Sequence, residues 1–211
     1  MYPYARKKLT EVVKMIILAS GSPRRKEILS ELGVDFRVIV ADTDESSDER
    51  DPARLTEELA RRKGLAVWEK IMRERPEGID PDECTVISAD TVVCNGGEIL
   101  GKPRDKEDAE RMIRSISGRS HEVISGVAIT RGGKVKSASC ITRVRVAEIP
   151  DEEIKRYVES GEPMDKAGAY GIQGKFSLWV EGIDGCYFSV VGLPVNTLQN
   201  LYFECTGERL A

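Results

Sequence analysis

The stretch from Ile16 to Leu32, I-I-L-A-S-G-S-P-R-R-K-E-I-L-S-E-L, changes within a few residues from an apolar run to an amphipathic pattern. The run Met15–Ala19 is typical of a buried strand, and the residues after it have apolar side chains on one helical face. Ser22 suits the N-cap of that helix, Pro23 its first position, and Gly33 its left-handed end. The sequence therefore predicts a strand, a tight turn and a capped helix.

This predicted turn has the features of an anion-binding site. The N-terminus of a helix carries free backbone N–H groups and the positive end of the helix dipole. Arg24 and Arg25 follow at once, and guanidinium forks match the oxygens of a phosphate. The alternative is an ordinary strand–helix turn with solvated arginines. Neither G-x-x-x-x-G-K-[ST] nor G-x-G-x-x-G is present, so the pattern is not that of a P-loop or of a dinucleotide fold.

The charge balance limits the partners of the chain. Its 211 residues suffice for one domain with a sizeable core. Acidic residues outnumber basic ones by 36 to 32, which gives a net charge of -4. A binder of nucleic-acid polymers needs a basic face, so we expect a local basic pocket for a small anion instead. No apolar run approaches the ~20 residues that span a bilayer, so no membrane association is expected.

The cysteines and the single histidine argue against a metal centre built from their side chains. The five cysteines are scattered at positions 84, 94, 140, 186 and 205, and none has metal-ligand spacing. An odd number of scattered cysteines indicates reduced thiols buried as small hydrophobic groups, and hence a cytoplasmic protein. One histidine, His121, excludes a multi-histidine zinc site, and we expect it to serve structure. Residues 1–14 lack the apolar core of a signal peptide, so we interpret them as an N-terminal extension preceding a single domain, 15–211.

The remaining patterns predict an α/β fold with a mixed sheet. Strands are expected at 36–41, 85–89, 92–94, 99–100, 121–131, 134–148, 178–183 and 187–191, and helices at 52–75, 105–116, from 150 to near 161, and at 194–204. Asn95-Gly96-Gly97-Glu98 and Gly132-Gly133 are typical of hairpin turns. Strands and helices alternate early and a hairpin meander follows, so we expect two lobes with a groove between them.

The acidic candidates are Asp90 and a loop at 42–49. Asp90 follows an apolar run, and ligands of open α/β sheets bind beyond the carboxyl ends of strands. A turn-capping aspartate is the alternative. Thr91 beside it is either a ligand contact or an ordinary strand residue. Asp44 or Glu45, together with Asp90, would offer hard oxygen ligands to Mg²⁺, whereas the bland interpretation of this loop is a solvated surface.

The basic and amide candidates lie in three further segments. Lys63, in A-R-R-K-G-L-A, has the pattern of a surface charge, whereas Lys102, in G-K-P, is fixed near the hairpin after Asp90. The segment M-D-K-A-G-A-Y-G-I-Q-G at 164–174 combines small residues, which permit close approach to a ligand, with Asp165 and Gln173. A single amide with nearby backbone groups is suited to read a planar base. A structural Gly-rich turn is the alternative.

Five motifs occur in order between Leu18 and Gly174, within a match that runs from about Ile16 to Phe203: L-A-S-G-S-P-R-R-K-E-I-L, S-A-D-T-V-V, G-K-P-R-D, S-G-R-S-H and E-P-M-D-K-A-G-A-Y-G-I-Q-G. Together they resemble those of the Maf family of nucleoside triphosphate pyrophosphatases. The resemblance implies an elongated mixed β-sheet flanked by helices, with two lobes around a nucleotide cleft, as in the inosine triphosphate pyrophosphatases. It also implies a homodimer.

The resemblance further implies an activity and roles for individual residues. The activity is hydrolysis of a nucleoside triphosphate to the monophosphate and pyrophosphate with a divalent cation, Mg or Mn. The complete G-A-Y-G-I-Q-G is similar to the branch that prefers dTTP and UTP, with modified pyrimidine nucleotides as further candidates. Asp90 matches the proton acceptor, and Glu45 with Asp90 would hold the metal. Positions tied to substrate choice are matched by Arg24, Thr91 and Gln173, and other polar cleft positions, which bind substrate, by Ser20, Arg25, Lys63, Lys102 and Asp165.

Two other functions remain open at this point. The family has been linked to inhibition of septum formation, which suggests a non-catalytic nucleotide-sensing regulator of cell division. An enzyme of the same superfamily that clears damaged purine triphosphates is the second alternative. Release of pyrophosphate by the purified protein, compared between purine and pyrimidine triphosphates, separates all three.

Overall fold

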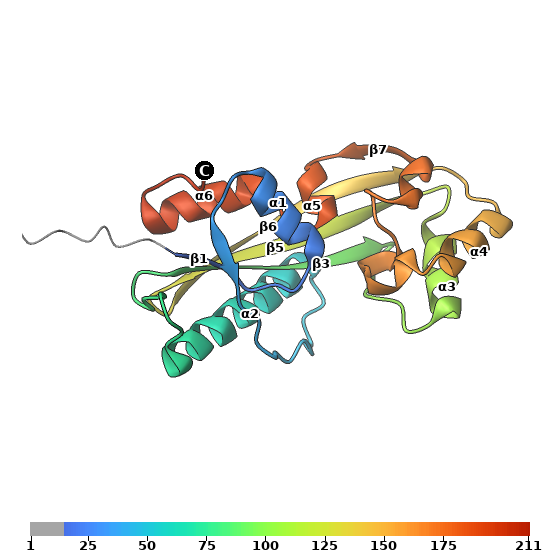
Figure 1. The fold of residues 1–211 in the computed structure, drawn as a ribbon. Coiled ribbons are helices and arrows are strands. Elements are labelled where there is room, and N and C mark those ends of the chain that lie inside the picture. The colour runs from blue at the N-terminus through green and yellow to red at the C-terminus, as the bar shows by residue number, and fades with distance from the viewer. Residues whose placement is uncertain (1–14) are drawn as a thin grey trace, which may run out of the picture.

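The structure, a computed structural model, describes residues 15–211 and confirms the expected α/β fold with a mixed sheet flanked by helices (Figure 1). The strands are β1 (Ile16–Leu18), β2 (Phe36–Val38), β3 (Thr85–Asn95), β4 (Glu98–Leu100), β5 (Ser120–Arg131), β6 (Lys134–Val146) and β7 (Val180–Asp184). The helices are α1 (Pro23–Glu31), α2 (Pro52–Glu74), α3 (Lys106–Ile116), α4 (Asp151–Glu159), α5 (Tyr187–Val191) and α6 (Val195–Thr206), with 3-10 turns η1 (Glu162–Asp165), η2 (Ala167–Ala169) and η3 (Lys175–Trp179). The predicted extension, 1–14, lies outside the described residues.

One seven-stranded sheet runs through the whole described chain. Its order is β2-β1-β3-β5-β6-β7, and β4 pairs with β3 beside this path. β1 is parallel to β2 and β3, and all other pairs are antiparallel. Figure 1 shows α2 on one face and α1 and α6 on the other at one end of the sheet, with α3 and α4 at the far end. The two ends form the two lobes.

An interruption along one edge of β3 separates the lobes. β1 pairs with β3 from Thr85 to Ile87, and β4 pairs with it from Val93 to Asn95. Asp90 and Thr91 lie between these two partners, where no described strand pairs with that edge of β3. The prediction that the strand ends at residue 89 is therefore wrong. β3 continues because its other edge pairs with β5 without a break past Asp90.

The hydrophobic core is divided between the lobes. In the first lobe, one buried cluster lies between the sheet and helices α1 and α6, and another lies under α2. In the second lobe, α3 and α4 pack against the sheet through residues such as Ile113 and Ile154, and the ring of Phe176 is fully buried among them. Each such side chain contributes about 1.5–3 kcal/mol to the free energy of unfolding through burial.

Two glycines allow α2 to lie directly on the sheet. A Cβ atom added to Gly126 in β5 would overlap the backbone of Thr56, and one added to Gly64 in α2 would lie 2.6 Å from Oγ1 of Thr130. In the same contact, the Ser88 hydroxyl donates to the carbonyl oxygen of Ala60 at 2.7 Å. The side chains that lie between helix and sheet here, those of Ser88 and Thr130, are small, so residues on this face of α2 reach the strands.

The predicted strand at 187–191 is wrong, because this segment forms the helix α5. Its sequence, Y-F-S-V-V, has four apolar residues around Ser189, and so short a run fits a strand or a helical turn equally well by periodicity. The Ser125 hydroxyl donates to the carbonyl oxygen of Ser189 at 2.8 Å, which holds α5 on the face of β5 rather than at the sheet edge. The strand before it, β7, pairs with β6 alone among the described strands. The strand predicted at 36–41 is also shorter, since β2 ends at Val38.

The first helix begins and ends as predicted, but it is capped differently. Ser22 occupies the N-cap of α1 and Pro23 its first turn, yet the Ser22 side chain makes no capping hydrogen bond. The backbone N–H of Ser22 instead donates to Oγ of Ser20 at 3.2 Å. Gly33 has the left-handed φ of 72° expected just after a helix.

All five cysteines are free in the structure. Only Cys84 is buried, so the expectation that the thiols are buried is wrong for the four others, which are partly exposed. Within residues 15–211, no helix is long and apolar enough to cross a membrane.

His121 has the structural position that the sequence predicts. Its ring is 2% exposed, and Nε2 lies 2.6 Å from Oη of Tyr170. Nδ1 is buried without a hydrogen-bond partner. Burial lowers the pKa of His121 from 6.5 to about 4. A protonated ring is therefore disfavoured in the folded protein relative to the unfolded chain.

This pKa difference predicts a loss of stability on mild acidification. Below pH 6.5 the unfolded chain binds a proton that the folded protein excludes, so the free energy of unfolding falls with pH down to about 4. Between pH 7 and pH 5 the loss from His121 alone is about 2 kcal/mol. Urea denaturation at both pH values checks this, with His121→Gln as the comparison. An equal loss in the variant would assign the effect to other groups.

The contact between α2 and the sheet predicts that Gly126→Ala destabilises the fold. The added methyl group overlaps the backbone of Thr56, and forced overpacking costs about 1–3 kcal/mol. Gly101→Ala is the matched control, because nothing lies within 4 Å of its added Cβ. Thermal or urea unfolding of both variants measures the difference. Equal stability of the two variants would contradict the close approach.

Candidate functional site

A cleft of about 1010 Å³ opens where the edge of β3 is interrupted. Its walls come from the turn after β1, from α2, from β3, from the connection after β4 and from the segment 162–174. All ten residues predicted from the sequence line it: Ser20, Arg24, Arg25, Glu45, Lys63, Asp90, Thr91, Lys102, Asp165 and Gln173. The structure thus brings together residues from six separate segments, while their individual roles stay predictions.

The turn after β1 presents a helix N-terminus to this cleft. The residues from Ser20 to Arg24 line the cleft, and the N-terminal N–H groups of α1 have no acceptor within the helix. Because Ser22 makes no side-chain cap, the positive end of the helix dipole is left for a ligand. This is the anion-binding geometry predicted for the turn.

Arg25 joins three segments around the cleft. Its Nε donates to the carbonyl oxygen of Gly192 at 2.8 Å, Nη1 to Oγ of Ser20 at 3.1 Å and Nη2 to Oγ1 of Thr91 at 3.2 Å. Desolvation lowers the pKa of Arg25, while the charge of the nearby Asp90 carboxylate acts in the opposite direction. Three of its five N–H groups thus bind protein, so Arg25 fixes the first turn of α1 as well as carrying charge.

The Thr91 side chain lies on the same face of the sheet as Arg25, and both of its hydrogen-bond partners are protein groups. Its hydroxyl lies 2.8 Å from Oγ of Ser125 and accepts the hydrogen bond from Arg25. Successive residues of a strand point to opposite faces, so Asp90 points to the face that α2 covers. The contact between Asp90 and Lys63 of α2 agrees with this direction.

Lys63 links the two predicted metal ligands. Its ammonium Nζ lies 2.6 Å from Oδ1 of Asp90 and 2.9 Å from Oε1 of Glu45. Asp90 is 8% exposed, so this contact is shielded from solvent. The hydrogen bond from Lys63 lowers the pKa of Glu45 against the effect of burial, and the charge of Lys102 lowers it further. Lys63 is therefore a cleft residue rather than a surface charge.

Of the two acidic alternatives in the loop at 42–49, Glu45 faces the cleft. The Asp44 carboxylate accepts the backbone N–H of Ser46 at 2.9 Å and is not part of the cleft wall. Glu45 lines the cleft and contacts Lys63. Adjacent residues on an extended chain point in opposite directions, which places only one of the two carboxylates inside.

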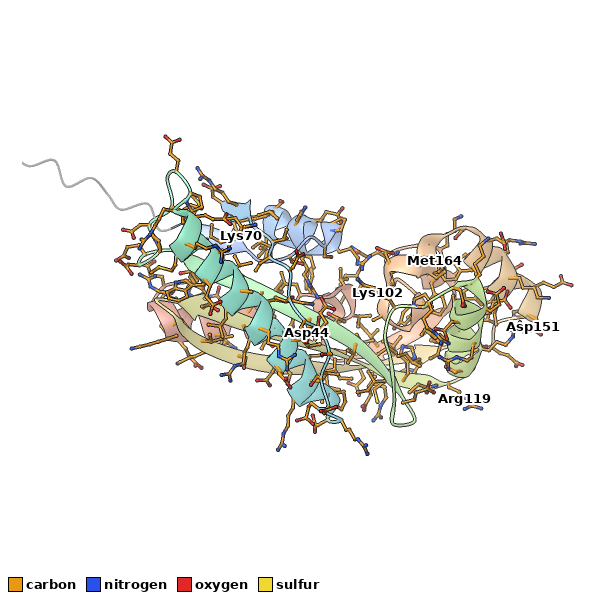
Figure 2. All side chains as sticks on the ribbon, turned by 90° about the horizontal axis from the view of Figure 1, so that it is seen from below. Asp44, Lys70, Lys102, Arg119, Asp151 and Met164 are labelled. Atoms are coloured by element: carbon orange, nitrogen blue, oxygen red, sulfur yellow. The ribbon has the colours of Figure 1, made fainter. Side chains whose placement is uncertain are left out.

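Lys102 and Gln173 have side chains free for a ligand. Neither makes a side-chain hydrogen bond or ion pair with another residue of the described range 15–211. Figure 2 shows Lys102 in the middle of the molecule, between α2 and the lobe that carries Met164. Both residues line the cleft. A free ammonium and a free amide inside one cleft are suited to different parts of one ligand, an anionic part and a polar planar part.

Asp165 of η1 is an acidic residue on the cleft wall that the second lobe forms. Its carboxylate lies 2.7 Å from Nζ of Lys166 and 3.4 Å from Nη1 of Arg24. Burial raises the pKa of Asp165, but the hydrogen bond and charge of Lys166 outweigh it, so the pKa is lowered on balance. The contact with Arg24 reaches across from α1 to η1, and it joins the two lobes over the cleft.

Glu162, for which no role was predicted, also lines the cleft. It stands in the motif E-P-M-D-K, so its position beside Asp165 was the available signal. Its carboxylate accepts hydrogen bonds from Tyr157 and from the backbone of Lys175, contacts that no sequence pattern reveals.

Glu45 and Asp90 are the residues that could hold a divalent cation together with a substrate. Within residues 15–211, no group of three or more histidine, cysteine or acidic side chains is arranged to hold a metal. Mg²⁺ usually binds one or two carboxylates together with waters and substrate phosphates. Glu45 and Asp90 already contact one cation, the ammonium of Lys63, and thus offer two oxygen ligands in one place. The arrangement can therefore neutralise a polyanion and accept a proton from water.

The chain is similar over most of its length to known proteins. Residues 15–204 match the family described as Maf-like protein. A Chromobacterium violaceum protein named dTTP/UTP pyrophosphatase is 50% identical over 194 residues, which cover 90% of this chain and 93% of that protein. Proteins of the same name from Acetivibrio thermocellus and Thermococcus kodakarensis are 46% and 44% identical, covering 88% and 89% of this chain and 92% and 95% of theirs.

Among solved structures, the Staphylococcus aureus Ham1 protein matches with a TM-score of 0.44 and 16% identity, covering 64% of this chain and 73% of that chain.

The two neighbouring arginines predict different effects on stability. Arg25→Met removes three hydrogen bonds that join α1, β3 and the end of α5, so we expect a loss of about 2 kcal/mol or more in the free energy of unfolding. Arg24→Met is the matched control. It removes one long, partly exposed ion pair, and we expect a change within about 0.5 kcal/mol. Chemical denaturation measures both. A smaller loss for Arg25 than for Arg24 would contradict its structural role.

Proposed function

This chain belongs to the Maf family, and on that premise we propose that it hydrolyses dTTP and UTP to the nucleoside monophosphate and pyrophosphate. Relatives at 44–50% identity carry the name dTTP/UTP pyrophosphatase. The observation that carries the proposal is the shared cleft, in which the Asp90 carboxylate and the N-terminus of α1 with Arg24 line one hollow.

In this proposal, the triphosphate lies against the N-terminus of α1. Backbone N–H groups there, the guanidinium of Arg24 and the free ammonium of Lys102 would bind the phosphate oxygens. These groups stabilise the negative charge that grows on the leaving pyrophosphate, and such stabilisation often lowers the barrier more than any other effect in an active site. The hydrogen bonds of Arg25 support this role, since they hold the turn in place before substrate arrives.

Asp90 is the proposed general base. Lys63 binds its Oδ1, and Oδ2 has no hydrogen-bond partner among the described residues. Oδ2 is therefore available to accept a proton from a water molecule as that water attacks the α-phosphorus. The bond between the α-phosphorus and the bridging oxygen then breaks, and pyrophosphate leaves with the bridging oxygen.

A divalent cation, Mg or Mn, is the proposed cofactor. Glu45 and Asp90 would hold it, with the substrate phosphates completing the ligand set. Such a cation supplies charge neutralisation at the phosphates. The ammonium of Lys63 contacts both carboxylates and keeps them together before any cation binds.

The preference for pyrimidines is assigned to Gln173, in the wall formed by the segment 162–174. The Gln173 amide offers one donor group and one acceptor, which match the polar edge of thymine or uracil. The positions of Arg24 and Thr91 are the other two that the family resemblance ties to substrate choice. We further propose a homodimer in the cytoplasm that acts on free nucleotides, modified pyrimidine nucleotides included, and not on nucleic-acid polymers or membranes.

The test is pyrophosphate release with Mg²⁺ from a panel of dTTP, UTP, CTP, dATP and ITP. We expect dTTP and UTP to be the best substrates. Asp90→Asn keeps the shape of the side chain but removes its basicity, so we expect turnover to fall by at least about 100-fold, as for loss of a general base. Asp44→Asn is the matched control, because its carboxylate lies in the adjacent position outside the cleft wall.

Each alternative function has its own result in this assay. Nucleotide binding without pyrophosphate release would favour the sensing regulator. Faster release from ITP or dATP than from dTTP would favour the enzyme for damaged purine nucleotides. Near-normal turnover by Asp90→Asn would refute the assignment of the base.

A further inference from the structure

The segment that carries Gln173 has little regular structure of its own. Between Glu162 and Lys175 the chain forms two short 3-10 turns, η1 and η2, and no strand or α-helix. The Gln173 side chain binds no described residue. A ligand-reading amide in such a segment is positioned only by the contacts of its neighbours in the chain, and a misplaced amide loses its discrimination.

Tyr157 supplies the first of these contacts. It belongs to α4, and its ring is 7% exposed and packs at 5.5 Å from the ring of Phe176. Its hydroxyl accepts the backbone N–H of Gly171 at 3.4 Å and donates to Oε1 of Glu162 at 3.1 Å. Tyr157 thus connects the helical core of the second lobe to the residue two positions before Gln173.

Glu162 supplies the contacts on the other side of Gln173. Its Oε2 accepts the backbone N–H of Lys175 at 3.2 Å. A Cβ added to Gly174 would overlap this carboxylate, so the carboxylate lies flat against the backbone next to Gln173. Glycine at 174 thus leaves room for the carboxylate of Glu162, and its φ of -95° is one that other residues also adopt.

Lys166 connects Glu162 and Gly171, which lie nine residues apart in this segment. Its Nζ donates to the carbonyl oxygen of Glu162, and its stem packs on Gly171, where an added Cβ would lie 2.7 Å from Cε. The protonation state of Tyr157 also favours its hydrogen bond to Glu162. Burial, and then the charge of Glu162, raise the pKa of Tyr157, so the phenol stays protonated and donates to the carboxylate.

We propose that Tyr157 and Glu162 are positioning residues that hold Gln173 at the base and thereby set selectivity between pyrimidine and purine nucleotides. They fix the backbone on both sides of Gln173, at Gly171 and at Lys175. This inference rests on the proposed function, because it needs Gln173 to face the base of a bound nucleotide. Neither side chain is assigned a contact with the substrate.

The main experiment compares affinities for UTP and GTP in Tyr157→Phe. This variant removes one hydroxyl and keeps the ring that packs on Phe176. We expect the Kd for GTP divided by the Kd for UTP to fall toward unity by about five-fold, the effect of losing the neutral hydrogen bond that holds the Gly171 amide. Inorganic tripolyphosphate has no base and reports binding of the phosphates alone. Its Kd for the variant should stay within about two-fold of its Kd for the wild type. Calorimetric titration of the full chain without a divalent cation, so that no nucleotide is hydrolysed, gives all three values.

Two further variants separate positioning from general stability. Glu162→Gln keeps the size of the side chain, removes its charge and sets an amide donor against one of the two donors, Tyr157 or the backbone of Lys175, so we expect the same loss of selectivity. Tyr170→Phe is the matched control, because its buried hydroxyl contacts His121 and not the backbone around Gln173. We expect Tyr170→Phe to lower the free energy of unfolding measurably and to leave the Kd ratio unchanged.

Hydrogen exchange without nucleotide tests the contacts themselves. We expect the amides of Gly171 and Lys175 to exchange faster in Tyr157→Phe and Glu162→Gln than in the wild type, and their rates to stay unchanged in Tyr170→Phe.

The outcomes separate this inference from the proposed function. Faster exchange with an unchanged Kd ratio would overturn the inference, and so would an equal loss of affinity for UTP, GTP and tripolyphosphate. Wild-type protein that binds UTP but releases no pyrophosphate would overturn the proposed function alone, since selectivity is measured here by binding.

Discussion

The interruption along one edge of β3 is the constraint on which the rest of the site depends. β1 and β4 pair with opposite ends of the same edge, so the middle of a central strand has no partner strand on one side among the described residues. Asp90 and Thr91 occupy that opening and point to opposite faces of the sheet. Charged groups from α1, from α2 and from the second lobe can then approach the same few backbone positions. An unbroken sheet would have buried this edge and left no room for a ligand.

The close approach of α2 places charged groups beside this interruption on one face of the sheet. Gly64 and Gly126 remove the side chains that normally separate a helix from a sheet, and Lys63 is thereby brought to Asp90 and Glu45. An ammonium held by two carboxylates costs less to bury than any of the three charges alone, because each is compensated. Arg25 has the corresponding position on the face of the sheet opposite α2, where it donates hydrogen bonds to Ser20, Thr91 and Gly192. Both faces of β3 thus carry a cation whose partners belong to different segments of the chain.

Local patterns in the sequence predicted much of this molecule. Capping residues and helical periodicity predicted α1 and α2 within one or two residues, and the motifs predicted ten residues that lie in one cleft. Contacts between distant segments were not predictable in the same way. The continuation of β3 past Asp90 depends on pairing with β5, and the helical form of 187–191 depends on packing over β5. The bonds of Tyr157 and Glu162 to the Gln173 segment likewise join residues through folded geometry, which no periodicity in the chain records.

The continuity of β3, β5 and β6 has a mechanical consequence. These strands run through both lobes, so the lobes share hydrogen-bonded backbone rather than a hinge peptide. Widening the space between the lobes means twisting a stiff ribbon of three strands, and many ladder bonds resist that deformation together. A molecule that enters meets walls whose separation is already set, and little conformational freedom is lost on its arrival.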